Sequence, residues 1–313
     1  DHPYPTDPGV LDQQAGPVGT DGNGAAPRQL PGAPALFVGR EKHLIDLDHA
    51  LTPVDGDPAA GAAVVISALG GAGGIGKTWL ALHWAHRHAD QFPDGQLFVD
   101  LRGFSPDSQP LDPAVAVRRF LDALGVEPGR LPTDPDAQAA LYRSLIADKR
   151  MLMVLDNAAT TDQVAPLLPG TSTCTVLVTG RTKLAALIDR HGARHLQLDL
   201  LAREEAHALL IERLGGGRVA AEPDAVDELI ELCGRYPLAL AIIARTAATR
   251  PAIPLSEIAT ELRELGLVAL DHDTDPAASL SSVLSWSLRH LTDEQRTVFA
   301  LLGIAPGPDI TLP

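Results

Sequence analysis

The sequence is poor in cysteine and in aromatic residues, and it contains no long apolar run. Its two cysteines, Cys174 and Cys233, lie far apart, so neither a disulfide framework nor a zinc site is expected, and a reducing compartment fits. No apolar run reaches the roughly 18 residues that span a membrane, and no signal peptide is recognisable. We therefore expect a cytoplasmic protein without a membrane partner.

Positive charge is also scarce. The formal net charge is −15, whereas non-specific binding to nucleic acid needs basic surface, so this chain itself is not expected to grip DNA. Its 313 residues suffice for two domains, and 45% hydrophobic content with 4% aromatic residues predicts an aliphatic core. The chain begins at Asp1 and stops at Pro313 soon after a helical pattern, so we expect a segment of a longer protein.

Four short apolar runs and a fifth, weaker strand candidate alternate with helical patterns, which is typical of a parallel sheet covered by helices on both faces. Residues 1–34 have hardly any large apolar side chain and predict a disordered linker. From residue 202 onward the pattern becomes all-helical. The predicted strands are 63–69, 96–101, 151–155, 175–179 and 195–198, and the predicted helices are 41–51, 79–92, 113–124, 135–148, 160–168, 204–214, 224–233, 238–249, 256–266, 279–291 and 293–302.

The stretch Gly71-Ala72-Gly73-Gly74-Ile75-Gly76-Lys77-Thr78 fits the phosphate-binding pattern G-x-x-x-x-G-K-[ST] at every fixed position. It lies between a predicted strand and a predicted helix, which is the context the pattern requires. Its backbone N–H groups and the helix N-terminus would face a phosphate, Lys77 would reach the outer phosphates, and the Thr78 hydroxyl would hold Mg²⁺. The nucleotide contacts expected here are Gly71, Gly73, Gly74, Ile75, Gly76, Lys77, Thr78 and Trp79.

An aspartate ends the third predicted strand. Asp156 follows a run of aliphatic residues, at the sheet edge where open α/β sheets bind ligands, and we expect it to hold Mg²⁺ together with Thr78, mostly through water. Any buried strand that ends in a turn can carry an aspartate, but its place after the glycine-rich loop favours the metal role. Asn157 stands where many hydrolysing ATPases carry a carboxylate, and an amide cannot accept a proton near pH 7. This predicts slow hydrolysis unless another base is present.

Arg181 follows the fourth predicted strand. As a bidentate cation it could contact a γ-phosphate and distinguish ATP from ADP, or it could simply be a surface arginine that starts the next helix. The candidate catalytic residues are therefore Lys77, Asp156 and Arg181. Three histidines after the loop, at positions 83, 86 and 88, have no carboxylate at ligand spacing, so we expect packing or solvated roles rather than metal binding.

The order of these motifs resembles that of the NB-ARC/STAND class of P-loop signalling ATPases. The segments that carry the resemblance are Phe37–Glu41, Gly71–Thr78, Leu152–Asp156, Thr179–Arg181 and Gly234–Ala239. The resemblance implies a sheet in the order 5-1-4-3-2. It also implies that Phe37, Val38 and Arg40 lie at the adenine side and that Pro237 and Leu238, in the G-x-P-L-A motif, pack near the base, although a proline there could merely start a helix.

Within this class the chain is most similar to the nucleotide-binding region of AfsR-type Streptomyces antibiotic regulatory proteins. That resemblance implies a P-loop domain over residues 35–201, a helical subdomain over 202–270 and the start of a winged-helix subdomain over 277–313. It also implies a DNA-binding module outside this chain. The chain ends before the nucleotide-sensing histidine motif of the winged-helix subdomain would occur.

We therefore predict a molecular switch that binds ADP or ATP with Mg²⁺, hydrolyses ATP slowly, and self-associates when it holds ATP. It would act within a transcriptional regulator of secondary metabolism and contact other domains of its own chain. Two alternatives remain: a turnover ATPase or kinase on the same fold, and a scaffold that keeps nucleotide only as a structural ligand. Asn157 argues against the turnover enzyme.

Overall fold

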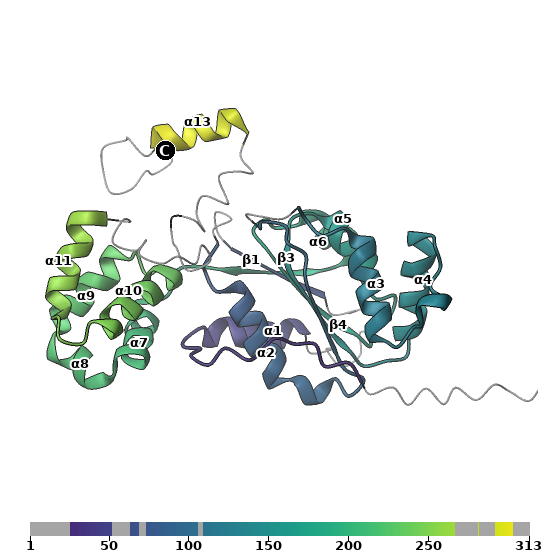
Figure 1. Cartoon of the computed structure of the whole chain (residues 1–313), viewed down its shortest axis with the longest axis horizontal. Coiled ribbons are helices and arrows are strands. Elements are labelled where there is room, and N and C mark those ends of the chain that lie inside the picture. Colours follow the sequence, from purple (N-terminus) through teal and green to yellow (C-terminus); the bar gives the residue numbers. More distant parts are fainter. Residues whose placement is uncertain are drawn as a thin grey trace, which may run out of the picture.

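The computed structural model describes residues 26–51, 63–68, 73–105, 109–266, 281 and 292–302. Within them one parallel sheet has the strand order β2-β3-β4-β1-β5 (Figure 1). Counted from its other edge this is 5-1-4-3-2, the order that the family resemblance implies, and it places β4 directly beside β1. The strands are β1 (Ala63–Ala68), β2 (Gln96–Asp100), β3 (Leu152–Ala158), β4 (Thr175–Gly180) and β5 (Arg194–Leu198).

Helices cover both faces of this sheet. Successive residues of a strand point to opposite faces, and because both sets are apolar in the central strands, both faces are buried against helices. Leu152 and Val154 of β3 pack with α1 and α2, whereas Met153 and Leu155 pack with α3, α4 and α5. The fold is therefore the three-layered α/β arrangement that the sequence predicts. The covering helices are α1 (Glu41–Leu51), α2 (Lys77–Arg87), α3 (Pro113–Ala123), α4 (Pro135–Ile146), α5 (Thr161–Val164) and α6 (Ala185–His191), and three 3₁₀ turns are η2 (Ala89–Gln91), η3 (Pro128–Arg130) and η4 (Ala165–Leu167).

The helices that follow β5 have a core of their own. Leu210, Leu229 and Leu240 are buried there with other aliphatic side chains of these helices, and the group lies to one side of the sheet (Figure 1). The predicted division at residue 202 falls between β5 and the first of them. They are α7 (Arg203–Leu214), α8 (Gly216–Ala221), α9 (Pro223–Leu232), α10 (Pro237–Thr249) and α11 (Leu255–Leu265), and a separate helix, α13 (Asp293–Leu302), follows later in the chain.

Several elements differ from the sequence predictions. The predicted linker is too long at its C-terminal end, because the backbone of Gln96 in β2 accepts a hydrogen bond from Gln29 N–H and donates one to the Pro27 carbonyl. The short helix α8 was not predicted, since Gly216 and Gly217 argue against one. Gly71, the predicted helix 279–291 apart from residue 281, and most of the predicted winged-helix part lie outside the described residues.

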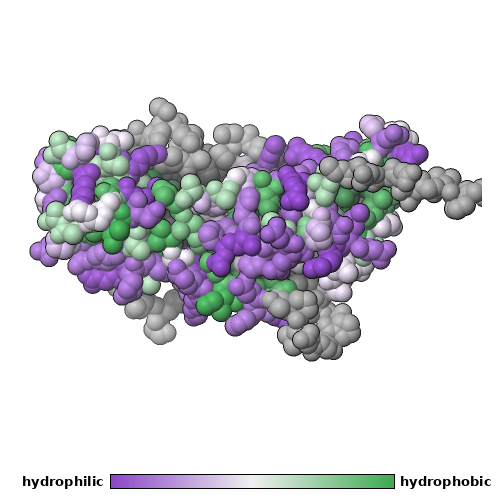
Figure 2. Space-filling model, turned by 90° about the horizontal axis from the view of Figure 1, so that it is seen from below, coloured by the Kyte–Doolittle hydropathy of each residue, from purple (hydrophilic) through white to green (hydrophobic). Residues whose placement is uncertain are grey.

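The face of the molecule seen in Figure 2 is mostly hydrophilic, with hydrophobic residues interspersed over the helical part. This agrees with the large negative net charge of the chain. Among the described residues, no helix is both long and apolar enough to cross a membrane.

Candidate functional site

The glycine-rich loop leads from β1 into α2, as its pattern requires. Gly76 precedes the helix with φ 98° and Gly74 has φ 82°, both in the left-handed region that favours glycine. Lys77 and Thr78 are the first two residues of α2. Their side chains therefore start at the positive end of the helix dipole, where an anion is favoured.

Asp156 lies against this helix end and is buried. Its Oδ1 accepts a hydrogen bond of 2.8 Å from the Thr78 hydroxyl and another of 2.5 Å from the Thr179 hydroxyl of β4. Burial raises the pKa of Asp156, and these two hydrogen bonds oppose that shift. The fold thus brings together the two residues predicted to hold Mg²⁺, a hydroxyl and a carboxylate, which are the hard oxygen ligands that Mg²⁺ prefers.

Lys77 and Arg181 lie close enough to influence each other. The pKa of Lys77 falls to about 8, first because burial disfavours its charge and second because Arg181 is near, while Asp156 opposes the shift. Burial also lowers the pKa of Arg181, whose guanidinium carbon lies 5.0 Å from the centre of the Phe104 ring. Two partly desolvated cations at a helix N-terminus form a suitable site for a polyanion such as a phosphate chain.

Asn157 leaves the regular strand geometry. Its φ of 57° lies at an irregularity in the pairing of β3 with β4, and its backbone N–H donates to the Thr179 hydroxyl oxygen at 2.9 Å. Its side-chain nitrogen lies 3.5 Å from Oδ1 of Asp100, which ends β2 in register with Asp156. A carboxylate, that of Asp100, therefore stands one strand away from the candidate metal site, which the linear sequence did not suggest.

Arg40 joins the loop to the segment between β5 and α7. It is buried, and its guanidinium donates to the Asp199 carbonyl at 2.7 Å and to the Ile75 carbonyl at 3.1 Å. Its backbone N–H donates to Oε1 of Glu205 in α7 at 2.5 Å. Arg40 is predicted to contact nucleotide, and in the fold its hydrogen bonds connect Ile75 of the loop with Asp199 and Glu205.

The helical part approaches the loop at the start of α10. The Tyr236 hydroxyl donates a hydrogen bond to the Gly73 carbonyl, and Pro237 is the first residue of the helix. Leu238 lies against Gly74: a Cβ built at Gly74 would be 2.7 Å from its Cδ2. The G-x-P-L-A motif therefore meets the glycine-rich loop directly, over 160 residues away in sequence.

The remaining predicted contacts lie around α2. The Phe37 ring stacks on His83, with ring centres 4.0 Å apart, while Val38 is half-buried and Trp79 is exposed. His86 faces the Pro31 carbonyl at 2.7 Å, and His88 stacks on Trp84. His88 Nε2 also lies 3.2 Å from Oδ1 of Asp48. The described residues contain no group of three or more metal-binding side chains.

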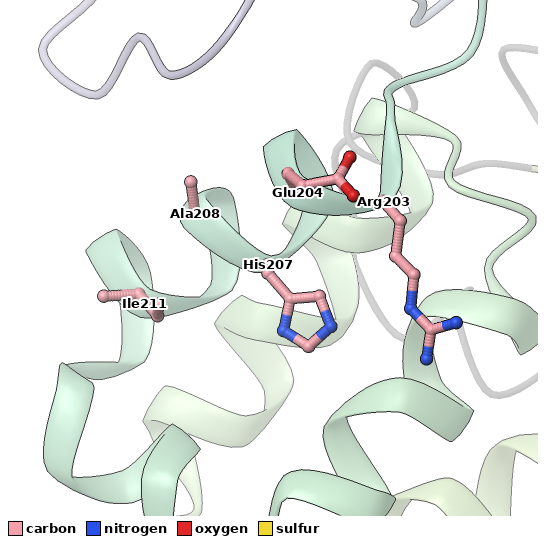
Figure 3. A pocket seen from close by; sticks show the side chains of 5 residues that line it. All are labelled: Arg203, Glu204, His207, Ala208 and Ile211. Carbon is pink, nitrogen blue, oxygen red and sulfur yellow. The ribbon is translucent and has the colours of Figure 1, made fainter.

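A further pocket lies along α7 (Figure 3). It is lined by Arg203, Glu204, His207, Ala208 and Ile211. Asp227 of α9 holds two of these side chains, because its carboxylate lies 2.8 Å from the Arg203 guanidinium and 2.7 Å from His207 Nε2. Two of the three polar side chains that line this pocket, Arg203 and His207, therefore contact α9 across the surface between the two helices.

Comparison with known proteins gives close relatives for this chain. No family model matches it. It is 38% identical over 306 residues, or 98% of its length, to the regulatory protein AfsR of Streptomyces coelicolor, and 37% identical over 286 residues, or 91%, to AfsR of Streptomyces griseus. The chain is a homologue of the AfsR regulatory proteins. It spans only 30% and 28% of the lengths of these two relatives, so the similarity concerns one segment of the AfsR chains.

One solved structure similar to this chain is that of a STAND protein with a tetratricopeptide repeat sensor from Pyrococcus horikoshii. It is 18% identical, covers 91% of this chain and 36% of its own, and has a TM-score of 0.47. This likeness is too weak to add to the fold described above.

Four residues at this site were missed by sequence reasoning: Asp100, Thr179, Glu205 and Tyr236. Thr179 and Tyr236 stand inside motifs that the sequence did highlight, so their side-chain hydroxyls were available as a signal. Glu205 has only its place in the first turn of α7 as a signal, and its contact with Arg40 spans 165 positions. Such a contact depends on how two subdomains pack, which spacing along the chain does not reveal.

Proposed function

We propose that this chain is a nucleotide-operated switch within a transcriptional regulator. The observation that carries the proposal is that the hydroxyls of Thr78 and Thr179 both donate to Asp156 at the start of α2. Lys77 and Arg181 lie nearby. A hydroxyl, a carboxylate and two cations at a helix N-terminus fit a nucleoside di- or triphosphate with Mg²⁺. The AfsR homology supports the regulator, and the described geometry supports the nucleotide site.

Each residue has a role in this proposal. The backbone of Gly73, Gly74, Ile75 and Gly76 would surround the phosphates, and Lys77 would neutralise the outer ones. Thr78 and Asp156 would hold Mg²⁺, which supplies charge neutralisation to the phosphate oxygens. Arg181, oriented by the Phe104 ring, would bind a γ-phosphate and so distinguish ATP from ADP.

The switch would lie between the P-loop domain, residues 35–201, and the helical subdomain, residues 202–270. We propose that ADP favours the packed arrangement, in which Pro237 and Leu238 lie on the loop near the base and Phe37, Val38 and Trp79 border the site. A ligand at 100 times its dissociation constant stabilises the state it binds by about 2.7 kcal/mol. ATP would instead favour an arrangement that self-associates, because only ATP offers a γ-phosphate to Arg181.

The wider role rests on the AfsR homology. DNA would be bound by a module outside this chain, since the net charge of −15 opposes direct binding. The regulated genes would belong to secondary metabolism, and the protein would act in the cytoplasm.

The test of the switch is its nucleotide-dependent assembly. We expect light scattering to give a larger particle mass with ATP and Mg²⁺ than with ADP and Mg²⁺, and Arg181→Ala to abolish that difference. A mass that is the same with ATP, with ADP and with neither would contradict the proposal. Lys183→Ala, which removes an exposed cation two positions away, is the control for charge.

A second candidate function is a turnover ATPase, and Asp100 is the observation that favours it. This carboxylate ends the strand next to Asp156 and could orient or deprotonate an attacking water in place of Asn157. A steady-state rate in the range typical of kinases, about 1–100 per second, that Asp100→Asn reduces at least about a hundredfold would favour the enzyme. A slow rate that Asp100→Asn leaves unchanged would favour the switch.

A further inference from the structure

Glu205 uses one carboxylate to connect two subdomains. Its Oε2 accepts a hydrogen bond of 2.8 Å from the backbone of Ala202 at the start of α7, and its Oε1 accepts the N–H of Arg40 from the α/β part. The side chain passes closely over Gly39, where a Cβ would lie 2.9 Å from Glu205 Cγ. Gly39 and Arg40 both have left-handed backbone geometry, with φ of 73° and 70°, which the packing around Glu205 must hold in place.

This contact continues into the glycine-rich loop. The guanidinium of Arg40 donates to the carbonyl of Ile75, so α7 is connected through Glu205 and Arg40 to the loop. Arg40 is buried, and a buried guanidinium that lost its partners would be strongly unfavourable. The position of Glu205 and the position of Ile75 are therefore linked.

Tyr236 makes the second connection, two residues earlier in the loop. Its hydroxyl donates to the Gly73 carbonyl, and its ring is half-buried against aliphatic side chains of both cores. Because Tyr236 directly precedes α10, the hydrogen bond ties the first turn of that helix to the loop. Residues 73–75 are thus held from both α7 and α10.

We propose that Glu205 and Tyr236 are positioning residues that couple the orientation of the helical subdomain to the shape of the glycine-rich loop. The proposal rests on the function proposed above and adds the residues through which the loop acts on the subdomain. A phosphate that reshapes residues 73–75 would change both connections together. Coupling between sites is reciprocal, so weakening either connection must also change nucleotide affinity.

The test uses two conservative variants of the 313-residue chain. Tyr236→Phe removes only the hydroxyl. Glu205→Gln leaves a single acceptor oxygen, whereas the backbone N–H groups of Arg40 and Ala202 each need one. One hydrogen bond corresponds to roughly a threefold to tenfold change in an equilibrium. We therefore expect each variant to lower the affinity for ADP by about that factor, and to speed amide exchange in peptides covering residues 36–40 and 73–80 without nucleotide.

The chain offers a matched control for each variant. Tyr142→Phe removes another tyrosine hydroxyl that donates to a backbone carbonyl, that of Leu167 at 3.2 Å, inside the α/β core. Glu222→Gln removes another carboxylate that accepts two backbone N–H groups, those of Leu255 and Ser256, inside the helical subdomain. Both controls are expected to leave ADP affinity and exchange in the two peptides unchanged.

The outcomes separate this proposal from the proposed function. If Tyr236→Phe and Glu205→Gln behave like their controls in either measurement, the coupling is overturned. If the unaltered chain binds no ADP, the nucleotide function fails, and the exchange comparison without nucleotide alone decides whether the two residues position the loop. Faster exchange with weakened ADP binding supports the coupling.

Discussion

Thr179 is the residue on which the geometry around Asp156 depends. It is buried, its hydroxyl donates to Oδ1 of Asp156, and the same oxygen accepts the backbone N–H of Asn157. The Thr179 hydroxyl therefore forms hydrogen bonds both to the Asp156 carboxylate and to the backbone N–H of Asn157, where the strand geometry is irregular. Serine could preserve this arrangement, whereas valine, of nearly the same shape, could not.

We expect Thr179→Val to lower the free energy of unfolding by about 2 kcal/mol, because it leaves the partly buried N–H of Asn157 and one acceptor site of the buried Asp156 carboxylate unsatisfied. Urea denaturation of the nucleotide-free chain measures this. Thr179→Ser, which keeps the hydroxyl, is expected to cost less than half as much. Equal losses for the two variants would mean that shape, and not the hydroxyl, matters at this position.

At the scale of elements, apolar runs predicted β1 to β4, because buried parallel strands must be almost continuously apolar. The edge strand β5, whose residues alternate between polar and apolar, gave a weaker signal. The pattern around Lys77 likewise predicted a strand, a loop and a helix in that order. The end of β3 was predicted only approximately: the sequence suggested an apolar run over 151–155 that ends in Asp156-Asn157, whereas β3 continues to Ala158. The irregularity at Asn157 arises from pairing with β4, a strand that lies about 20 residues further along the chain.

Sequence reasoning named Thr78 and Asp156, which the fold brings together, but not the residues that support them. Asp156 and Thr78 stand in recognisable patterns, and the fold brings them to 2.8 Å. The assignment of Arg40 to nucleotide rested on family resemblance, and its hydrogen bonds to protein carbonyls depend on three segments that meet only in the folded chain. Local patterns predict elements and motifs, but contacts between subdomains require the packing itself.

Glu222 shows how one element is held by another. Pro254 precedes α11 and offers no side-chain cap, so Glu222 accepts the N–H groups of Leu255 and Ser256 instead. These hydrogen bonds favour the charged carboxylate and lower the pKa of Glu222. The stabilisation is therefore complete above the ordinary glutamate value of about 4.3 and is lost as the pH falls through the lower value of the folded chain.

We expect Glu222→Gln to lower the free energy of unfolding by about 0.5–1 kcal/mol near neutral pH, at the low end for a helix cap because water screens this half-exposed group. The difference from the unaltered chain should shrink as the pH falls below about 4. Denaturation at several pH values measures it, with Glu264→Gln, at an exposed position of α11, as the charge control. A difference that grows on acidification would contradict this role.

At the scale of the whole molecule, two hydrophobic cores meet at the glycine-rich loop. Gly74 lies at that meeting point, because an added Cβ would come within 2.7 Å of Leu238 in α10. Its φ of 82° also favours glycine. Gly192 has a similar backbone, with φ of 64°, but open space where a Cβ would stand. Alanine substitutions at these two glycines therefore distinguish the cost of backbone strain, which both share, from the cost of contact with Leu238, which only Gly74 has.

We expect Gly74→Ala to destabilise the chain by more than Gly192→Ala, and Leu238→Ala to recover part of the excess. In a double-mutant cycle, Gly74→Ala and Leu238→Ala should deviate from additivity by at least about 0.5 kcal/mol, whereas Gly192→Ala and Leu238→Ala should be additive. Denaturation of the single and double variants gives these values. Additivity in both cycles would show that Leu238 does not press on the loop.

The central claim is that the start of α2 holds a nucleotide. Equilibrium titration of the chain with ADP and Mg²⁺ tests it most directly, comparing the unaltered chain with Lys77→Ala and with Lys149→Ala, which removes a lysine between α4 and β3. We predict one saturable site in the unaltered chain and in Lys149→Ala, and at least a tenfold loss of affinity in Lys77→Ala with nucleotide-free stability retained. Binding that is absent from the unaltered chain, or equal in Lys77→Ala, would contradict the account.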